Sequence, residues 1–156
     1  MKFQRFHDSQ LPGLMTWFRN ADETRTWGGP PFRFPFTEAT FREDAKLSSL
    51  PTWSLVGDGQ LAAFGQCYLR VGRCHFGRLA VSPKLRGHGH GTTLIREQAR
   101  WGSAEFGVDQ YSLFVIASNP RAIALYRRLG FSEMPYPEPS PELETFIYMV
   151  ATKLAP

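Results

Sequence analysis

The pattern of apolar and polar residues predicts three elements in the first third of the chain. They are a strand at residues 2–6, a helix from residue 9 to about 20, and a second helix from residue 37 to about 47. A polar side chain that can cap a helix stands at the start of each helix, as Thr37 does. Between the helices, glycine and proline exclude regular structure from residues 27–36, although four aromatic side chains of this segment need burial.

From residue 52 the pattern takes the period of two that is typical of strands. Strands are expected at residues 52–56, 60–71 and 74–81. In the second of them, one face holds apolar residues such as Leu61, Ala63 and Cys67. The other face holds Gln60, Gln66 and Arg70. We therefore expect this strand to have one buried face and one polar face.

The rest of the sequence alternates helices with strands. A helix is expected at residues 89–106, where apolar residues recur at helical spacing, and an apolar run at 111–117 predicts a central strand buried on both faces. Asn119 can cap the next helix, with Pro120 at its first position, and Gly130 can end it. A proline-rich loop at 135–141 and a last strand at 145–153 follow.

This succession of elements predicts a single α/β domain over residues 1–156, a sandwich built on a mixed sheet. No apolar run approaches the roughly 20 residues of a membrane span, and no apolar signal core follows the N-terminus. Cys67 and Cys74 are too few for a disulfide framework and are expected as half-buried strand residues. We therefore expect a cytoplasmic protein without a membrane partner, as a monomer or homodimer.

The net charge of +4 is concentrated in one part of the chain. Residues 70–100 carry seven basic side chains against Glu97 alone, whereas residues 1–69 are balanced. Fourteen of the 18 basic residues are arginines, whose planar donors suit phosphate. A local anionic partner is therefore expected, with a merely solvated face as the alternative. Nucleic acid is not expected, because zinc-finger spacing, a basic zipper and RNA-binding motifs are missing.

A glycine-rich loop joins the third of these strands to the helix that follows it. Its glycines leave backbone N–H groups free to converge on an anion at the start of the helix; they are Gly87, Gly89 and Gly91. Lys84 and Arg86 add positive charge beside the loop. The spacing fits neither the dinucleotide fingerprint nor the Walker loop. His88 and His90 have no Asp, Glu or Cys beside them, so no metal is expected.

Two motifs resemble those of one enzyme family. The loop reads Arg-x-x-Gly-x-Gly at Arg86, Gly89 and Gly91, which resembles the pyrophosphate-binding motif of the GNAT superfamily of acetyl-CoA-dependent N-acetyltransferases. Farther along, residues 119–131 are similar to the family's second motif, Asn-x-x-Ala-x-x-Leu-Tyr-x-x-x-Gly-Phe. The resemblance covers residues 74–131 closely. It implies the family's fold, a mixed and mostly antiparallel central sheet with helices on both faces.

The resemblance also implies direct transfer of an acetyl group from acetyl-CoA to an amine. The end of one strand would pair with the pantetheine arm, and the loop amides would hold the pyrophosphate. The residues expected to bind the cofactor are Leu79, Ala80, Val81, Arg86, Gly87, His88, Gly89, His90, Gly91, Thr92, Asn119 and Arg121. Tyr126 would protonate the departing CoA thiolate, because a phenol can supply that proton.

The base that accepts the amine proton is less well defined by the sequence. The strand at 74–81 holds no carboxylate, but His75 lies there, and a pKa near 6.5 suits a base at neutral pH. If the alternation holds, His75 shares a face with Leu79 and Val81. The alternative is a histidine at the strand edge and a proton that leaves through water. Further candidates come from the acceptor side: Asp22, Glu23 and Glu38.

The acceptor site is expected to be aromatic. In the family it is built from the N-terminal helices and the loop between the last two strands. The residues expected there are Trp27, Phe32, Arg33 and Tyr136. Because a polyamine or an aminoglycoside would need several carboxylates, we expect an acceptor with one amine, such as an amino acid, a small amine or a protein N-terminus or lysine. Arg33 would meet its carboxylate, if it has one.

Two alternatives to these interpretations stay open. In the first, the aromatic residues are simply core, because Phe and Trp bury readily. In the second, the protein is an acyl-CoA sensor without turnover, although binding alone does not require the Tyr126 hydroxyl.

Overall fold

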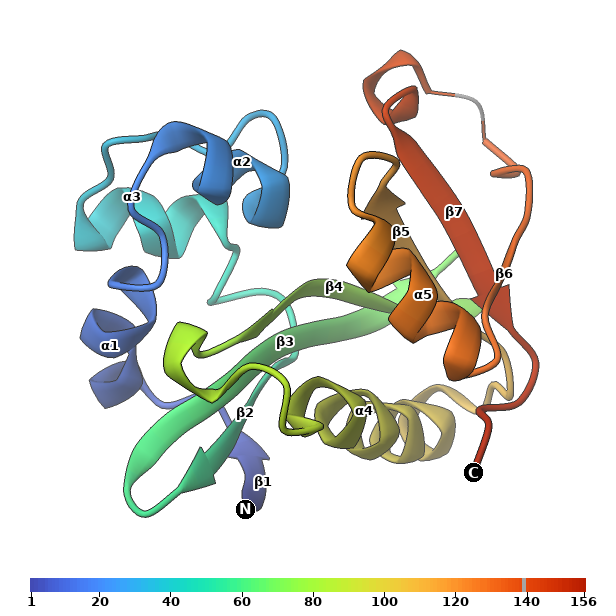
Figure 1. Ribbon diagram of the computed structural model, residues 1–156, viewed down its shortest axis with the longest axis horizontal. Helices are drawn as coiled ribbons and strands as arrows, with labels where there is room; N and C mark the ends of the chain where they lie inside the picture. Colours follow the sequence, from blue (N-terminus) through green and yellow to red (C-terminus); the bar gives the residue numbers. More distant parts are fainter. Residues whose placement is uncertain (139) are drawn as a thin grey trace. The chain divides into compact units, whose positions relative to one another are not determined.

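The computed structural model describes residues 1–138 and 140–156, whose seven strands form one sheet in the order β1-β2-β3-β4-β5-β7-β6 (Figure 1). The strands are β1 (Lys2–Arg5), β2 (Thr52–Gly57), β3 (Gln60–Arg70), β4 (Arg73–Val81), β5 (Tyr111–Ile116), β6 (Ser132–Glu133) and β7 (Phe146–Ala151). Strands β4 and β5 are parallel, whereas β1–β2, β2–β3, β5–β7 and β6–β7 are antiparallel. The predicted α/β class with a mixed sheet is confirmed.

The described residues also form five α-helices. They are α1 (Leu11–Met15), α2 (Ala21–Gly28), α3 (Glu38–Asp44), α4 (His90–Phe106) and α5 (Pro120–Arg128). The chain forms two compact units: a first unit of Met1–Gln66 and Arg78–Glu97, and a second unit of Cys67–Gly77 and Gln98–Pro156. The expected single domain stays a prediction, as does the monomer or homodimer. Among the described helices, none is both long enough and apolar enough to cross a bilayer.

The N-terminal helices differ from the prediction. The segment expected as one helix from residue 9 to 20 is a single 3₁₀ turn followed by the five residues of α1. Helix α2 was missed. It begins after Asn20, whose side-chain oxygen accepts a hydrogen bond from the Glu23 N–H at 2.8 Å. The capping residue for α3, Thr37, is confirmed, because its hydroxyl accepts from the Thr40 N–H.

Aromatic side chains fill the core of the first unit. Phe32, Phe41 and Phe64 are buried there with Leu11 and Leu14. Strand β3 does not have the one polar face that its alternation suggested, because residues 62–67 are all buried. The physical reason is that the face with Gln66 also holds Ala62 and Phe64, that Phe64 packs in the core of the first unit, and that buried Gln66 donates to the Ala45 carbonyl.

The second unit is organised around β5. Residues 74–76 of β4 pair with β5 in parallel, and β7 pairs with β5 in antiparallel. The apolar run that was predicted as a central strand therefore is a central strand. Cys67 and Cys74 are both free and fully buried, rather than half-buried as expected. Gly130 ends α5 at φ +103, and a Cβ there would meet the Lys153 carbonyl at 2.8 Å, so both conformation and space require glycine. Pro139 of the predicted 135–141 loop lies outside the described residues.

Candidate active site

The glycine-rich loop of the first unit has a backbone shaped for an anion. Gly87 and Gly89 have φ of +82° and +80°, which side chains other than glycine rarely adopt. The Gly89 carbonyl accepts from the Thr93 N–H at 3.0 Å, so this residue opens α4. Apart from the adjoining residues, no atom of the described part of the chain lies within 4 Å of the positions that Cβ atoms would take at either glycine, and residues 86–89 are exposed. The predicted loop between a strand and a helix is therefore open to a phosphate group.

The side chains around this loop are held locally. The His88 Nδ1 lies 3.0 Å from the Arg86 carbonyl, so this nitrogen carries the proton and donates it. The His88 and His90 rings are stacked at 6.2 Å. Within the described part of the chain, no group of three or more His, Cys, Asp or Glu side chains is placed to hold a metal ion.

Strand β4 has an interruption in its extended backbone at Arg78, where φ is +48°. The Trp27 Nε1 donates to the Arg78 carbonyl at 2.8 Å, and the Arg78 Nη1 donates to the Gln66 side-chain oxygen at 3.0 Å. Gln66 in turn donates to the Ala45 carbonyl at 2.7 Å. These contacts of the first unit fix the backbone just before Leu79–Val81, the segment expected at the cofactor.

The residues of the first unit that were predicted at the acceptor site pack in the core or form an ion pair. Trp27 is half-buried and stacks on Phe18 at 4.2 Å, while Phe32 is buried in the same cluster. Arg33 is paired: its Nη2 lies 2.8 Å from Asp44 Oδ1 and 3.3 Å from Glu43. The aromatic residues therefore act as core, and the charge of Arg33 is already neutralised.

Helix α5 of the second unit carries the other motif. The Asn119 Oδ1 accepts from the Ala122 N–H at 3.2 Å and begins the helix, and Arg121 is exposed in its first turn. Tyr126 is half-buried with its ring edge-on to Phe131. Burial raises the pKa of Tyr126 to about 12. Its hydroxyl therefore keeps its proton at neutral pH.

His75 occupies an interior position that does not suit the predicted base. Its ring is 2% exposed, and Nδ1 lies 2.9 Å from the Ser112 hydroxyl. Burial, followed by the nearby charge of Arg70, lowers the pKa of His75 to about 3. A base with so low a pKa accepts a proton poorly at neutral pH. The alternation that would place His75 on one face with Leu79 and Val81 is interrupted, because the backbone leaves the extended conformation at Arg78.

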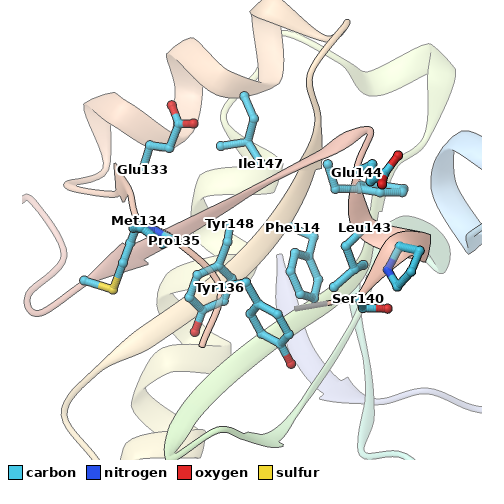
Figure 2. Close-up of a pocket in the computed structure, with 12 residues that line it drawn as sticks. Phe114, Glu133, Met134, Pro135, Tyr136, Ser140, Leu143, Glu144, Ile147 and Tyr148 are labelled. Carbon is cyan, nitrogen blue, oxygen red and sulfur yellow. The ribbon is translucent and has the colours of Figure 1, made fainter. Parts of the chain in front are cut away.

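The second unit contains a cavity of about 630 Å³ (Figure 2). The rings of Phe114, Tyr136 and Tyr148 lie together in its wall, with centroids 4.9 to 5.4 Å apart. Glu133 and Glu144 line other parts of it. Tyr136, the predicted acceptor residue of the C-terminal loop, is therefore at a cavity.

Comparison with known proteins decides the family. The model of the acetyltransferase (GNAT) family matches residues 21–131. This chain belongs to the acetyltransferase (GNAT) family. The family prediction is thereby confirmed.

Individual GNAT proteins are similar to this chain over different lengths. The [ribosomal protein bS18]-alanine N-acetyltransferase of Escherichia coli (strain K12) is 34% identical over 100 residues, which are 64% of this chain and 66% of that relative's length. The crystal structure of the ribosomal-protein-S18-alanine N-acetyltransferase from E. coli has a TM-score of 0.67 at 24% identity and covers 99% of this chain and 96% of its own. The spermidine N-acetyltransferase from Vibrio cholerae, solved with CoA and spermine, has a TM-score of 0.73 at 16% identity over 98% and 94% of the two chains. These structural likenesses show a shared GNAT fold.

Sequence reasoning missed three residues near Tyr136. Glu133 and Glu144 line the cavity, and Arg70 donates from Nε to the Tyr136 hydroxyl at 2.9 Å. Arg70 and Tyr136 are 66 positions apart in the chain. No local spacing signals that pairing, although the charge excess of residues 70–100 included Arg70.

Proposed function

We propose that this protein transfers the acetyl group of acetyl-CoA to a primary amine by direct attack. The observation that carries the proposal is the open glycine loop ahead of α4, with its two glycines at positive φ, in a chain of the GNAT family. The thioester of acetyl-CoA supplies an acetyl group that is activated toward an amine. The donor set fits that molecule, because backbone N–H groups and an arginine suit a pyrophosphate.

The cofactor-binding residues have separate tasks in this proposal. The N–H groups of residues 86–92 and the guanidinium of Arg86 hold the pyrophosphate, while the peptide groups of Leu79–Val81 bind the amide-bearing arm. Asn119 and Arg121, at the start of α5, also bind the cofactor. The hydrogen bond from Trp27 to the Arg78 carbonyl holds the β4 backbone in place for binding of the amide-bearing arm.

Tyr126 acts as the general acid. Its hydroxyl holds a proton at neutral pH, because burial raises the pKa of this phenol to about 12. Proton donation to the CoA sulfur lets CoA leave as a thiol and not as a thiolate. An acyl-CoA sensor releases no thiolate, so it would not need this group. The amine proton passes to water, since His75 is buried and β4 has no carboxylate.

The acceptor is an amine with one apolar or modest side group. This follows from the aromatic wall of the cavity in the second unit. A protein N-terminus is the second candidate, because the relative with 34% identity is named for an alanine of ribosomal protein bS18. A polyamine is a weaker candidate, because similarity to the spermidine enzyme is one of fold.

Two measurements test the proposal. In a thermal-shift experiment, acetyl-CoA and CoA should raise the Tm, whereas a DNA duplex should not. Release of CoA thiol should then be followed with amino acids, small amines, spermine and a peptide beginning with alanine. Binding of acetyl-CoA without thiol release from any amine would support a sensor instead. No stabilisation by acetyl-CoA would contradict the proposal itself.

A further inference from the structure

Arg70 lies against the aromatic wall of the cavity in the second unit. Its Cζ is 5.0 Å from the centroid of Phe114 and 5.5 Å from that of Tyr136. Its Nε donates to the Tyr136 hydroxyl at 2.9 Å. These contacts hold the planar guanidinium in one orientation, with cation–π attraction on its faces.

Among the residues that the structure describes, no carboxylate forms an ion pair with this guanidinium. Elsewhere in the structure Arg19, Arg33 and Arg42 form ion pairs with carboxylates. Arg70 itself is half-buried. Burial works against its charge, but the hydroxyls of Tyr136 and Tyr68 outweigh this and raise the pKa of Arg70. Arg70 thus stays cationic, and a carboxylate would supply the missing partner.

The cavity itself is lined by negative charge, while Arg70 lies against two rings of its wall and is not one of the lining residues. Phe114 and Tyr136, the two rings that Arg70 contacts, line the cavity, and so do Glu133 and Glu144. Figure 2 shows these two carboxylates on opposite sides of the central rings. Carboxylates in the lining, an apolar wall and a cation that contacts two rings of that wall together suit a molecule that carries an ammonium group, a carboxylate and an apolar side chain.

We propose that Arg70, together with the Tyr136 hydroxyl, binds a carboxylate of the acceptor, and that the acceptor is a free amino acid. This inference rests on the proposed acetyl transfer and names its substrate class. The carboxylate takes the role that the sequence suggested for Arg33, whose charge is already paired. Spermine and spermidine lack that group and would leave Arg70 without a partner.

The test compares matched acceptors that differ only in the carboxylate. The kcat/KM for L-alanine, L-leucine and L-phenylalanine is measured against that for each carboxamide. We expect wild-type protein to prefer the acids by about ten- to a hundredfold, the usual effect of a charge-assisted hydrogen bond. In Arg70→Gln the ratio of kcat/KM for the acid to that for the carboxamide should fall toward one. Arg70→Lys keeps the charge but loses the paired N–H donors of the guanidinium, so its ratio should lie between those of wild type and Arg70→Gln.

Arg5→Gln is the matched control, since it removes a guanidinium that also lies over an aromatic ring, Trp53, at 4.2 Å. It should keep the wild-type ratio. A wild-type ratio near one, a preference for spermine, or an unchanged ratio in Arg70→Gln would overturn the inference. If Arg70→Gln does not fold, the wild-type ratio and Arg70→Lys still decide.

A second measurement separates this inference from the proposed function. The N-acetyl amino acids and their carboxamides are titrated by calorimetry into protein that holds CoA. Tighter binding of the acids in wild type, lost in Arg70→Gln, supports the carboxylate site even if no amine is acetylated. Equal binding of acids and amides overturns it, even if acetyl transfer to other amines is observed.

Discussion

Tyr126 carries the most direct prediction for a single side chain. Tyr126→Phe keeps the ring that contacts Phe131 and removes only the proton-bearing hydroxyl. We expect kcat to fall by about 10²–10⁴, the usual contribution of a general acid. The Kd of acetyl-CoA should change little. Both are measured by thiol release and calorimetric titration.

Tyr111→Phe provides the control for this change. Tyr111 lies in the same unit and stacks on Phe76 at 5.9 Å, so its variant loses a hydroxyl outside α5. It should retain the wild-type kcat. Near-normal turnover in Tyr126→Phe, with acetyl transfer shown to be the slow step, would refute the acid role.

At the scale of elements, the loop before α4 depends on its backbone conformation. Gly89→Ala places a Cβ in open space but at φ +80°, which costs an L-residue about 1–2 kcal/mol. The loop should relax away from this geometry and weaken acetyl-CoA binding about tenfold. Gly13→Ala adds the same methyl in α1, again in open space but without positive φ. A folded Gly89→Ala protein with the same Kd as Gly13→Ala would argue against a phosphate loop.

The link between α2 and β4 can be tested separately. Trp27→Phe preserves an aromatic ring beside Phe18 and removes the N–H donated to the Arg78 carbonyl. Loss of one such hydrogen bond should lower the free energy of unfolding by about 1 kcal/mol and raise the KM for acetyl-CoA. Urea unfolding and steady-state kinetics measure the two effects. Trp17→Phe, in the same cluster, is the control and should leave the KM unchanged.

For the whole molecule, the buried His75 makes stability depend on pH. Burial lowers its pKa from 6.5 to about 3 in the folded protein. As the pH falls below 6.5, His75 becomes protonated in the unfolded chain but stays neutral in the folded protein. The stability that neutral His75 provides above pH 6.5 is therefore lost by about 1.4 kcal/mol per pH unit down to about pH 3.

Urea unfolding between pH 7 and 4 should show that His75→Gln reduces this slope. Asp8, Glu23 and Asp44 also have lowered pKa values, because they accept hydrogen bonds from arginines, so a residual slope is expected at the acid end. His88→Gln, which replaces an exposed histidine, should keep the wild-type slope. Identical slopes in wild type and His75→Gln would show that His75 does not control acid unfolding.

Much of the fold could be predicted because neighbouring residues carry the signals. Thr37 and Asn119 cap their helices through N–H groups three residues away. Gly130 ends α5 through its own φ. The helix after Asn20 was overlooked although the same signal is present there, an amide side chain followed by acidic residues. The start of α2 is therefore encoded locally, by Asn20 and the acidic residues that follow it.

The sequence by itself determined the glycine loop, the second motif and their order, because each depends on local backbone conformation and adjacent hydrogen bonds. Only the tertiary structure decided what the distant side chains do. Arg33 is paired with Asp44, 11 positions away, Trp27 reaches the Arg78 carbonyl across 51, and Arg70 meets Tyr136 across 66. His75 is buried against the Ser112 hydroxyl and the rings of Phe114 and Tyr68. Such contacts follow from how strands and loops pack, so no spacing in the sequence could assign an ion pair to Arg33 and leave Arg70 available for a carboxylate.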